Sequence, residues 1–547
     1  MNFRQLKTIV LSAGLLGGPV LLWAQPAGTA GPGPDTTGKV STAPANWFNL
    51  DRATDRVTGV STEKAYELLR NKTSRPVVVA VIDGGVDVKH EDLQGKLWIN
   101  PKETAGNGVD DDKNGFVDDV YGWNFIGGKD GQNVNEETYE LTRQYVALKK
   151  RFEGTKKVRR RDKADFAEYQ QIKEAFETKV SKLKKQAEGY LSFANAYKEA
   201  AAYLKTYLGK DSLTAADVDA IRPADPQVGR AQKVVQYAFE NGINEKELKE
   251  AEEYFDRSLN YGYNPEFDGR KVVGDNPDNL AEKGYGNNDV TGPDARHGSH
   301  VAGIIAANRA NETGIMGVAD NVQIMAIRAI PNGDERDKDV ANAIRYAVDN
   351  GAQIINMSFG KDYSPNKAYV DEAVRYAVSK GVLLVHAAGN DAKDIDTERN
   401  FPTRRYAKGG QETALWLEIG ASSWGGNDNF VGDFSNYGKG TVDVFAPGVD
   451  VYSTTPGSKY ESLSGTSMAA PVTSGVAALL MSYYPQLTAA QVKDIIVKSS
   501  VKYADEKVNK PGEEKDQTVA FGDLSISGGV VNAYEAVKLA ESMTAQK

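Results

Sequence analysis

Three side chains in this sequence have the types that catalysis by a serine nucleophile requires. Ser467 lies among the small residues of the stretch 464–471, and an apolar helical pattern follows over 472–480. We therefore expect Ser467 in the first turn of a helix, where unpaired backbone N–H groups and the helix dipole stabilise nearby negative charge. A serine at a helix start is also a common N-cap, and Ser467 alone would favour that interpretation.

Asp83 and His297 supply what a serine nucleophile lacks. Asp83 ends the apolar run 77–83, which is typical of a buried parallel strand. His297 begins a helical pattern of small residues over 297–306. A serine hydroxyl needs a base to take its proton, and the base needs a carboxylate to hold its tautomer. Asp83, His297 and Ser467 are the residue types that this chemistry demands.

The residues around these three side chains resemble the signatures of the subtilisin-like serine proteases, the subtilase family (peptidase S8). The sequence reads VIDGGVD at 81–87, HGSHVAG at 297–303 and GTSMAAP at 465–471, in the family's order. The resemblance covers roughly residues 60–130 and 285–540. It implies that Asp83 orients the base, that His297 is the general base and that Ser467 is the nucleophile. It also implies an endopeptidase whose substrates are polypeptides, hydrolysed through an acyl-enzyme.

The same resemblance assigns roles to residues that follow two other predicted strands. Asn390 ends the stretch AAGN at 387–390, where the family places the amide that donates a hydrogen bond to the oxyanion. Without the other motifs, an Asn after Gly would be interpreted as a turn residue. The stretch 358–360 resembles the segment that pairs with an extended peptide substrate. The candidate substrate-binding residues are Ser358, Phe359, Gly360, Ala388 and Gly389.

An acidic loop after the Asp83 strand predicts a structural calcium site. Residues 110–119 read DDDKNGFVDD, which follows the opening positions of a calcium-binding loop. The position of the usual bidentate glutamate holds Tyr121, so another carboxylate or a water molecule must complete the shell. The alternative is an acidic surface turn. The candidate Ca²⁺ ligands are Asp110, Asp112, Asn114, Phe116 (through its carbonyl) and Asp118.

Composition excludes several other classes of protein. The formal net charge of −9 argues against nucleic acid as a partner. The chain has no cysteine, which excludes disulfides, thiol catalysis and cysteine-ligated zinc. It has only four histidines, which argues against a metal centre built from several of them.

The first 24 residues have the pattern of a signal peptide. Arg4 and Lys7 precede a mostly apolar run over 9–23, and Ala24 before Gln25 is a plausible cleavage point. The alternative is a membrane anchor, but the run is shorter than a comfortable span. We expect an exported monomer, secreted or periplasmic, with no stable membrane span after cleavage. The composition of residues 25–45 is typical of a flexible linker. The roughly fifty residues before Pro76 are too few for the folded inhibitory pro-domain that the resemblance would imply, so we expect none there.

Alternating strand and helix patterns predict an α/β fold, a subtilisin-like parallel sheet flanked by helices. We expect strands at 77–83, 322–328, 354–360 and 382–386, with helices at 339–350 and 367–379. Active sites in such sheets lie at the C-terminal strand ends, where Asp83, Ser358 and Asn390 fall. The interval 133–262 is rich in charged helix formers, so we predict a helical insertion between the Asp83 strand and the His297 helix. The peptidase domain then comprises 46–132 and 263–547.

Two other functions fit parts of the pattern. A transpeptidase would resolve the acyl-enzyme with an amine instead of water. A non-catalytic peptide-binding or scaffold protein would use the helical insertion, but the intact motifs argue against it. For an endopeptidase, the insertion is expected to act as a lid or flank that filters substrates or restrains activity.

Overall fold

The computed structural model describes residues 43–545, apart from 224, 427–428 and 513–516. The predicted signal peptide, 1–24, and all but the end of the predicted linker lie outside the described residues. Tertiary contacts divide the described chain into two compact units. We call residues 141–267 the helical unit, and residues 43–140 together with 268–545 the sheet unit.

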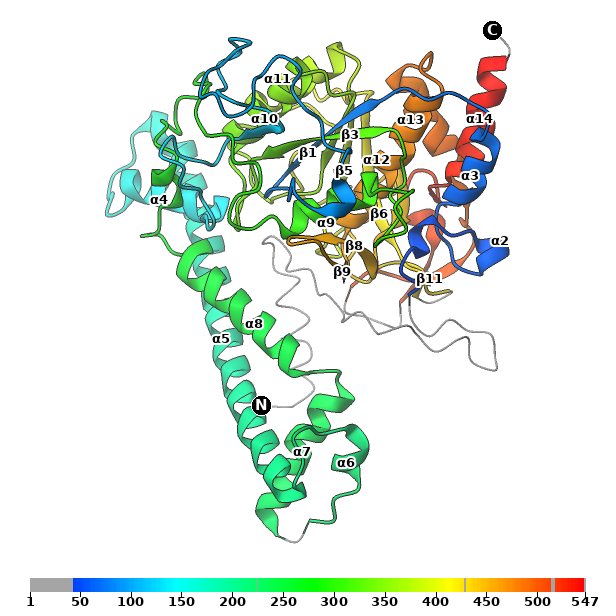
Figure 1. Cartoon of the computed structure of the whole chain (residues 1–547). Helices are drawn as coiled ribbons and strands as arrows, with labels where there is room; N and C mark the ends of the chain where they lie inside the picture. Colours follow the sequence, from blue (N-terminus) through cyan, green and yellow to red (C-terminus); the bar gives the residue numbers. More distant parts are fainter. Residues whose placement is uncertain (1–42, 224, 427–428, 513–516, 546–547) are drawn as a thin grey trace. The chain divides into compact units, whose positions relative to one another are not determined.

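The sheet unit is built on a nine-stranded sheet (Figure 1). Its strands are β1 (Val77–Asp83), β2 (Gly122–Asn124), β3 (Val322–Arg328), β4 (Ile354–Met357), β5 (Leu383–Ala387), β6 (Trp416–Ser422), β7 (Val444–Pro447), β10 (Val501–Lys502) and β13 (Gly529–Val530). They lie in the order β10-β13-β7-β6-β5-β4-β1-β3-β2. Every neighbouring pair from β13 to β2 is parallel, and only β10 runs antiparallel to its partner. The predicted parallel sheet is confirmed.

Helices cover both faces of this sheet, as the alternation within β1 shows. Val79 and Val81 pack in a core shared with α9 (Arg296–Ala306), α12 (Thr466–Tyr483), α13 (Ala489–Ser499) and α14 (Ala533–Ala545). Ala80 and Ile82 point to the other face and pack with α10 (Asp337–Asp349) and α11 (Lys367–Ser379). Successive side chains of a strand point to opposite faces, so a wholly apolar strand such as β1 needs a helical layer on each side. The predicted α/β fold with flanking helices is therefore confirmed.

The segment before β1 belongs to the core of the sheet unit. The side chains of Trp47 and Phe48 are fully buried, ahead of α2 (Arg52–Asp55) and α3 (Thr62–Leu69). Trp47 Nε1 donates a hydrogen bond to Asp450 O at 3.1 Å, and Ala533 N donates to Val60 O at 2.7 Å. Two small antiparallel pairs complete the unit: β8 (Val451–Thr455) with β9 (Lys459–Leu463), and β11 (Lys507–Asn509) with β12 (Thr518–Ala520).

The helical unit has a core of its own. Its helices are α4 (Glu140–Phe152), α5 (Lys163–Leu208), α6 (Ala215–Asp219), α7 (Pro226–Glu240) and α8 (Glu245–Arg257). The long helix α5 packs along α7 and α8, and Tyr190, Leu204, Val228 and Val235 are buried between them. These helices lie largely within the interval 133–262, for which the sequence predicts helices. Gly154, with a φ of 74°, follows the end of α4 and separates it from α5.

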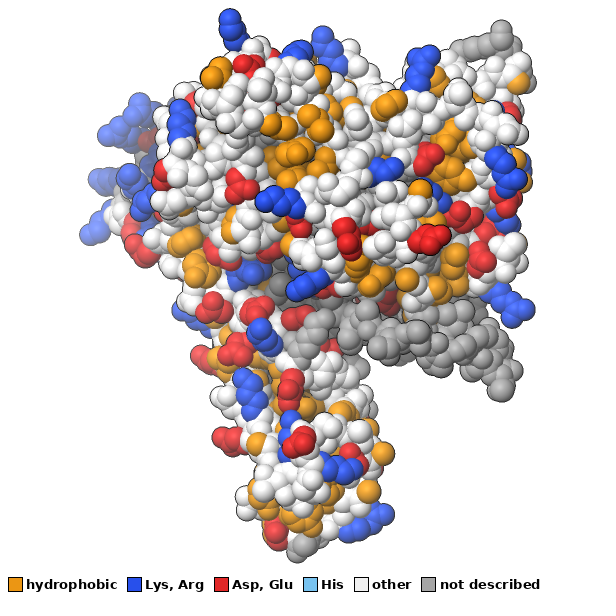
Figure 2. All heavy atoms as spheres, in the orientation of Figure 1, with side chains coloured by type: hydrophobic (Ala, Val, Ile, Leu, Met, Phe, Trp, Pro, Cys, Tyr) orange, Lys and Arg blue, Asp and Glu red, His pale blue; other side chains and the backbone are white. Residues whose placement is uncertain are grey.

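The charges on the face in Figure 2 are mostly mixed. Lys and Arg side chains lie among Asp and Glu side chains over most of both units, and several Lys and Arg side chains gather at the left edge of the view. Interspersed charges of both signs are typical of a solvated surface, whereas a face that binds a polyanion gathers one sign. Among the described helices, none combines the length and the hydropathy that crossing a bilayer requires.

Candidate active site

Asp83 and His297 meet where β1 ends and α9 begins. Asp83 has the same parity along β1 as Val79 and Val81, so its side chain points to the face that α9 and α12 cover. Nδ1 of His297 lies 2.8 Å from Oδ1 and 2.9 Å from Oδ2 of Asp83. Asp83 Oδ1 also accepts a hydrogen bond from Gly84 N at 2.7 Å. These bonds make Nδ1 of His297 the protonated nitrogen and leave Nε2 as the basic one.

A glycine allows α9 to approach the end of β1 this closely. A Cβ at Gly298 would lie 2.2 Å from Gly85 O and 3.0 Å from the Cβ of Asp83. Real Cβ atoms do not approach a backbone oxygen to that distance, so any larger residue would push the helix away from the strand. The small residue in the motif after His297 therefore has a packing role that sets the distance between His297 and Asp83.

The surroundings of His297 change its pKa in two opposing ways. Burial lowers the pKa, because it disfavours the charged imidazolium. The Asp83 carboxylate, through its charge and its hydrogen bonds, outweighs burial, and the net pKa of His297 lies above its ordinary value. The His297 side chain keeps 30% of its surface exposed, whereas that of Asp83 keeps 4%. His297 therefore reaches the surface while Asp83 is enclosed.

Ser467 is the second residue of α12, so its backbone N–H belongs to the first turn and has no partner within the helix. Its Oγ donates a hydrogen bond to Ser358 O at 3.2 Å, and Ser358 Oγ donates to Ser467 O at 2.9 Å. Within the described part of the chain, the recorded partner of the Ser467 hydroxyl is this carbonyl and not His297. Because α9 packs against α12, both residues lie on one face of the sheet. Hydrogen bonds between a nucleophile and its base often form fully only when substrate binds.

Thr466 fixes the orientation of Asn390. Oδ1 of Asn390 accepts hydrogen bonds from Thr466 N at 2.7 Å and from Thr466 Oγ1 at 2.9 Å. Thr466 Oγ1 in turn accepts from Gly389 N at 3.0 Å. With its oxygen held by Thr466, the Asn390 amide presents its Nδ2 hydrogens as donors beside the start of α12. Asn390 is 8% exposed, so these donors lie in a largely water-excluded position.

The candidate substrate-binding residues differ in what their backbones offer. Gly360 is exposed, and the described residues provide no recorded hydrogen-bond partner for its N–H or its carbonyl. Ala388 is enclosed, since its N–H donates to Ile419 O at 3.0 Å and its carbonyl accepts from Asn400 and Asn436. Gly360 therefore has free backbone groups for an extended ligand, whereas Ala388 is fully buried and its N–H and carbonyl are both used within the fold.

Two of the five predicted calcium ligands, Asp110 and Asp112, lie together in the structure. Carboxylate oxygens of Glu103, Asp110 and Asp112 lie within 4.8 Å of one another. Asp118 instead accepts hydrogen bonds from Asn107 N at 3.2 Å and Gly108 N at 2.8 Å. The Asn114 side-chain oxygen accepts from Phe116 N at 2.8 Å, which is the hydrogen bond of a tight turn.

Several residues of the site carried no recognisable signal in the sequence. Glu103 lies outside the calcium-loop pattern, and only the missing ligand at Tyr121 hinted that a further carboxylate was needed. Thr466 stands inside a motif, yet its contact with Asn390 joins positions 76 apart. His300, one turn after His297 in α9, is fully buried with Nε2 3.1 Å from Glu461 O, and burial lowers its pKa to about 3.

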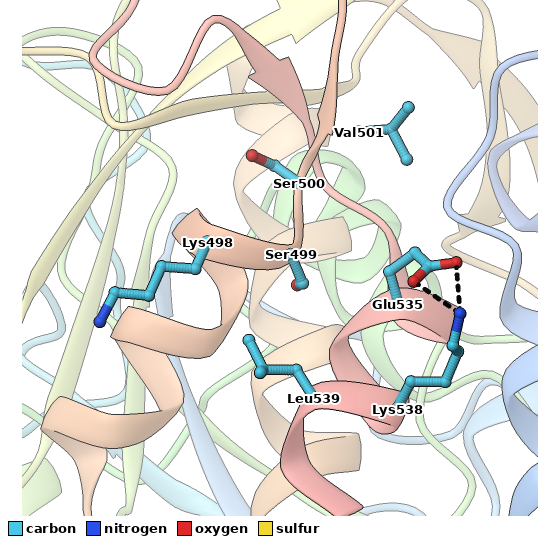
Figure 3. Close-up of a pocket in the computed structure, with 7 residues that line it drawn as sticks. All are labelled: Lys498, Ser499, Ser500, Val501, Glu535, Lys538 and Leu539. Atoms are coloured by element: carbon cyan, nitrogen blue, oxygen red, sulfur yellow. Dashed lines mark hydrogen bonds and ion pairs between the residues drawn. The ribbon is translucent and has the colours of Figure 1, made fainter. Parts of the chain in front are cut away.

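A pocket elsewhere on the sheet unit has no chemistry of this kind. It lies at the end of α13 and along α14, where Lys498, Ser499 and Leu539 line it (Figure 3). Lys538 forms an ion pair with Glu535 at 3.0 Å, and Lys498 forms one with Asp494 at 2.9 Å. Because its cations are already paired, the pocket offers no strong site for an anion.

Comparisons with known proteins agree on one family. The model of the subtilase family matches residues 74–518. A thermophilic serine proteinase of Bacillus sp. (strain AK1) is 40% identical over 228 residues, 42% of this chain and 51% of that protein. Thermitase of Thermoactinomyces vulgaris is 44% identical over 187 residues, 34% of this chain and 61% of thermitase. A solved structure of the protease domain of PatA is 28% identical, and the match covers 46% of this chain and 82% of that structure, with a TM-score of 0.36.

The chain thus spans between half and two thirds of the length of these two curated relatives. The family model, by contrast, covers most of this chain, from just before β1 to β12. The match includes the three stretches around Asp83, His297 and Ser467. The chain therefore belongs to the subtilase family.

Proposed function

We propose that this chain is an exported serine endopeptidase that hydrolyses peptide bonds through an acyl-enzyme formed on Ser467. The observation that carries the proposal is the contact of His297 Nδ1 with both carboxylate oxygens of Asp83, at 2.8 and 2.9 Å. In a subtilase, that contact leaves Nε2 as a base on the same face of the sheet as Ser467.

In the first half of the reaction, Ser467 Oγ attacks the scissile carbonyl carbon while His297 Nε2 takes its proton. The imidazolium that forms is stabilised by Asp83, which stays ionised. The bond to the leaving amine then breaks, and His297 returns the proton to the amine nitrogen. The products of this half are an ester on Ser467 and a free amino terminus.

The tetrahedral intermediate carries a negative oxygen that needs hydrogen-bond donors. The backbone N–H of Ser467 and Nδ2 of Asn390 are the proposed donors. Ser467 N–H lies in the positive first turn of α12, and Thr466 holds the Asn390 oxygen so that the amide hydrogens remain available. Water, activated by His297, then attacks the ester and releases the carboxyl terminus.

The proposed substrate is an extended polypeptide. Its backbone pairs with Ser358, Phe359 and Gly360 as an added strand, beside Ala388 and Gly389. The exposed, unbonded backbone of Gly360 supports this mode of binding. Pairing through the main chain places no demand on substrate sequence, so side-chain preference comes from neighbouring pockets.

We also propose a structural Ca²⁺ ion in the loop after β1. The donor set fits, because Glu103, Asp110 and Asp112 offer three hard carboxylate oxygens within 4.8 Å. Of the five ligands expected from the sequence, Asp110 and Asp112 belong to this group, with Asn114 and Phe116 next in the loop. Asp118 does not belong to this group of carboxylates and is the ligand with the least support. The ion would neutralise repulsion among the carboxylates and fix the loop.

The remaining assignments follow from the sequence pattern. We assign residues 1–24 to a signal peptide, 25–45 to a linker, 46–132 and 263–547 to the peptidase domain, and 133–262 to an insertion. After removal of the signal peptide, the mature protein would be a secreted or periplasmic monomer. A net charge of −9 disfavours nucleic acid as a partner, which fits polypeptide substrates.

Isotope labelling of the products tests the proposed reaction. The purified chain and its Ser467→Ala variant are incubated with an unstructured peptide in water enriched in ¹⁸O. We expect the new carboxyl termini to carry ¹⁸O with the wild type and no cleavage with the variant. A product joined to an added amine would instead indicate transpeptidation. Cleavage that persists in the Ser467→Ala variant would contradict the proposal.

A further inference from the structure

A buried histidine lies beneath the proposed substrate-binding segment, on the opposite face of the sheet from His297. His386 is in β5, in register with Met357 of β4 and Glu418 of β6. Val385 and Ala387, its neighbours in β5, pack in the core shared with α9 and α12. The alternation of the strand therefore directs His386 to the face that α10 and α11 cover.

Both ring nitrogens of His386 face oxygen atoms. Nε2 lies 2.9 Å from Phe359 O, and Nδ1 lies 2.8 Å from Glu418 Oε1. Because a carbonyl oxygen only accepts hydrogen bonds, Nε2 must carry a hydrogen and donate it to Phe359. The second oxygen of Glu418 accepts from Trp416 Nε1 at 2.7 Å, so the carboxylate is held at both of its oxygens.

The histidine is also fixed by packing. Its side chain is fully buried between the rings of Trp416 and Phe359, with centroid distances of 5.2 and 6.4 Å. A buried pair of a histidine and a carboxylate contributes little net stability compared with an apolar pair of similar volume. The pair does something that an apolar pair would not do, because it directs a hydrogen bond at one particular carbonyl group of the segment 358–360.

That carbonyl lies in the middle of a segment that is anchored at both ends. Ser358 is tied to Ser467 by two hydrogen bonds, at 2.9 and 3.2 Å. Lys361 exchanges two backbone hydrogen bonds with Phe401, at 3.0 and 2.9 Å. Without His386, the Phe359 carbonyl would have no partner on the sheet side among the described residues, and its peptide plane would be free to rotate.

We propose that His386 is a positioning residue for the peptide substrate, an inference that rests on the proposed role of the segment 358–360. Its Nε2 hydrogen holds the Phe359 carbonyl toward the sheet. Successive carbonyl groups of an extended chain point to opposite sides, so this one bond turns the unbonded carbonyl of Gly360 toward the peptide. Glu418 fixes the ring that donates the bond.

Two variants separate the hydrogen bond from packing. The double variant His386→Phe with Glu418→Gln keeps an aromatic ring between Phe359 and Trp416 and avoids an unpaired buried carboxylate, but it removes the donor to Phe359. The variant His386→Gln keeps a donor. The matched control is His90→Phe, because His90 is also fully buried with Nε2 3.0 Å from a backbone carbonyl, that of Lys459.

The measurement compares a peptide, which needs the segment 358–360, with a small fluorophosphonate, which reacts with Ser467 without pairing. In the double variant, we expect kcat/KM for a six-residue peptide to fall about tenfold to a hundredfold, mainly through KM. The rate constant of labelling should stay within about twofold. His386→Gln should recover most of the loss, and His90→Phe should leave the ratio of the two rates unchanged.

Parallel losses with peptide and probe, or no loss with either, would overturn the inference. So would a His386→Gln variant that is no better than the double variant. If the double variant does not fold, the single variant Glu418→Gln tests the inference instead. We expect its KM for the peptide to rise about threefold, and an unchanged KM would overturn the inference. A wild-type protein that neither cleaves nor labels would indicate instead that the proposed function itself is wrong.

Discussion

At the scale of single residues, the site depends on two side chains that orient others. Asp83 holds His297, and Thr466 holds Asn390. The first relation was predictable, because the motif around Asp83 and the motif around His297 are both recognisable in the sequence. The second was not, since it joins residues 76 positions apart through a hydrogen bond that only the folded chain creates. Sequence patterns predict which residue types are present more easily than which neighbour fixes each of them.

The raised pKa of His297 predicts the pH dependence of the reaction. Burial lowers this pKa, but Asp83 outweighs it, so the neutral base predominates only above the ordinary value of about 6.5. We expect the rate of Ser467 labelling to rise with pH through a midpoint above about 6.5. The same shift favours the protonated folded state, so its stabilising effect is complete below about 6.5 and is lost as pH rises through the raised pKa.

The variant Asp83→Asn should reverse this shift as well as slow the reaction. Without the carboxylate, burial alone acts on His297, so the midpoint should move to lower pH. The rate should fall by about 10⁴, because the imidazole loses its preferred tautomer. The control is the variant Asp294→Asn. The charge of Asp294 also raises the pKa of His297, but Asp294 is exposed, so its removal should shift the midpoint only slightly. A rate of labelling that does not change between about pH 5 and pH 8 would contradict the assignment of His297.

The proposed oxyanion donors predict a graded pair of variants. Asn390→Ala removes the amide donor and should lower kcat by about 10²–10³ with little change in KM, the scale that donor removal in the related subtilisin defines. Thr466→Val removes only one of the two hydrogen bonds that hold Asn390, so its loss should be about tenfold or less. Steady-state kinetics with one peptide checks both. An effect of Asn390→Ala confined to KM would instead indicate a role in binding.

At the scale of elements, apolar strands and amphipathic helices were the predictable part. The strand over 77–83 and the helix over 367–379 have the predicted bounds. Strands β6 to β9 were not predicted, because charged or polar residues such as Glu418 and Glu461 interrupt their patterns. In the structure, Glu418 is buried and bonded to His386 and Trp416. A tertiary contact therefore stabilises a strand that the sequence pattern does not predict.

The loop between β1 and β2 predicts a stabilising effect of calcium. An ion that binds only the folded state at about 100 times its Kd adds about 2.7 kcal/mol to the free energy of unfolding. We expect Ca²⁺ to raise the Tm and a chelator to lower it, with Mg²⁺ as the matched control. Glu103→Gln and Asp112→Asn should abolish the response.

Asp118→Asn separates a ligand from a structural residue in the same loop. Because Asp118 accepts hydrogen bonds from Asn107 and Gly108, its variant should lower the Tm equally with and without Ca²⁺. The opposite result would be a Tm that no longer responds to Ca²⁺ in Asp118→Asn but still responds in Glu103→Gln. It would support the ligands expected from the sequence over the group of Glu103, Asp110 and Asp112 in the structure.

At the scale of the whole molecule, the two compact units predict separable folding. Residues 141–267 have their own buried core around Tyr190 and Val235, and residues 43–140 with 268–545 have theirs. We expect a variant in which a flexible linker replaces 141–267 to unfold cooperatively and to keep Ser467 labelling within about threefold of the full chain. A deletion variant that is unfolded in circular dichroism would contradict the division into two units.

The same deletion tests the role expected for the insertion. If it filters substrates, its loss should change the ratio of cleavage rates for a short peptide and a folded protein. An unchanged ratio would exclude a filter, and the full chain assayed in parallel is the control.

The most direct measurement is labelling of the purified chain with a fluorophosphonate probe, with Ser467→Ala and His297→Ala as controls. The account predicts stoichiometric labelling of the wild type at Ser467, identified by peptide mass, and none in either variant. Labelling that survives in Ser467→Ala, or that persists at the wild-type rate in His297→Ala, would contradict an activated serine at the start of α12.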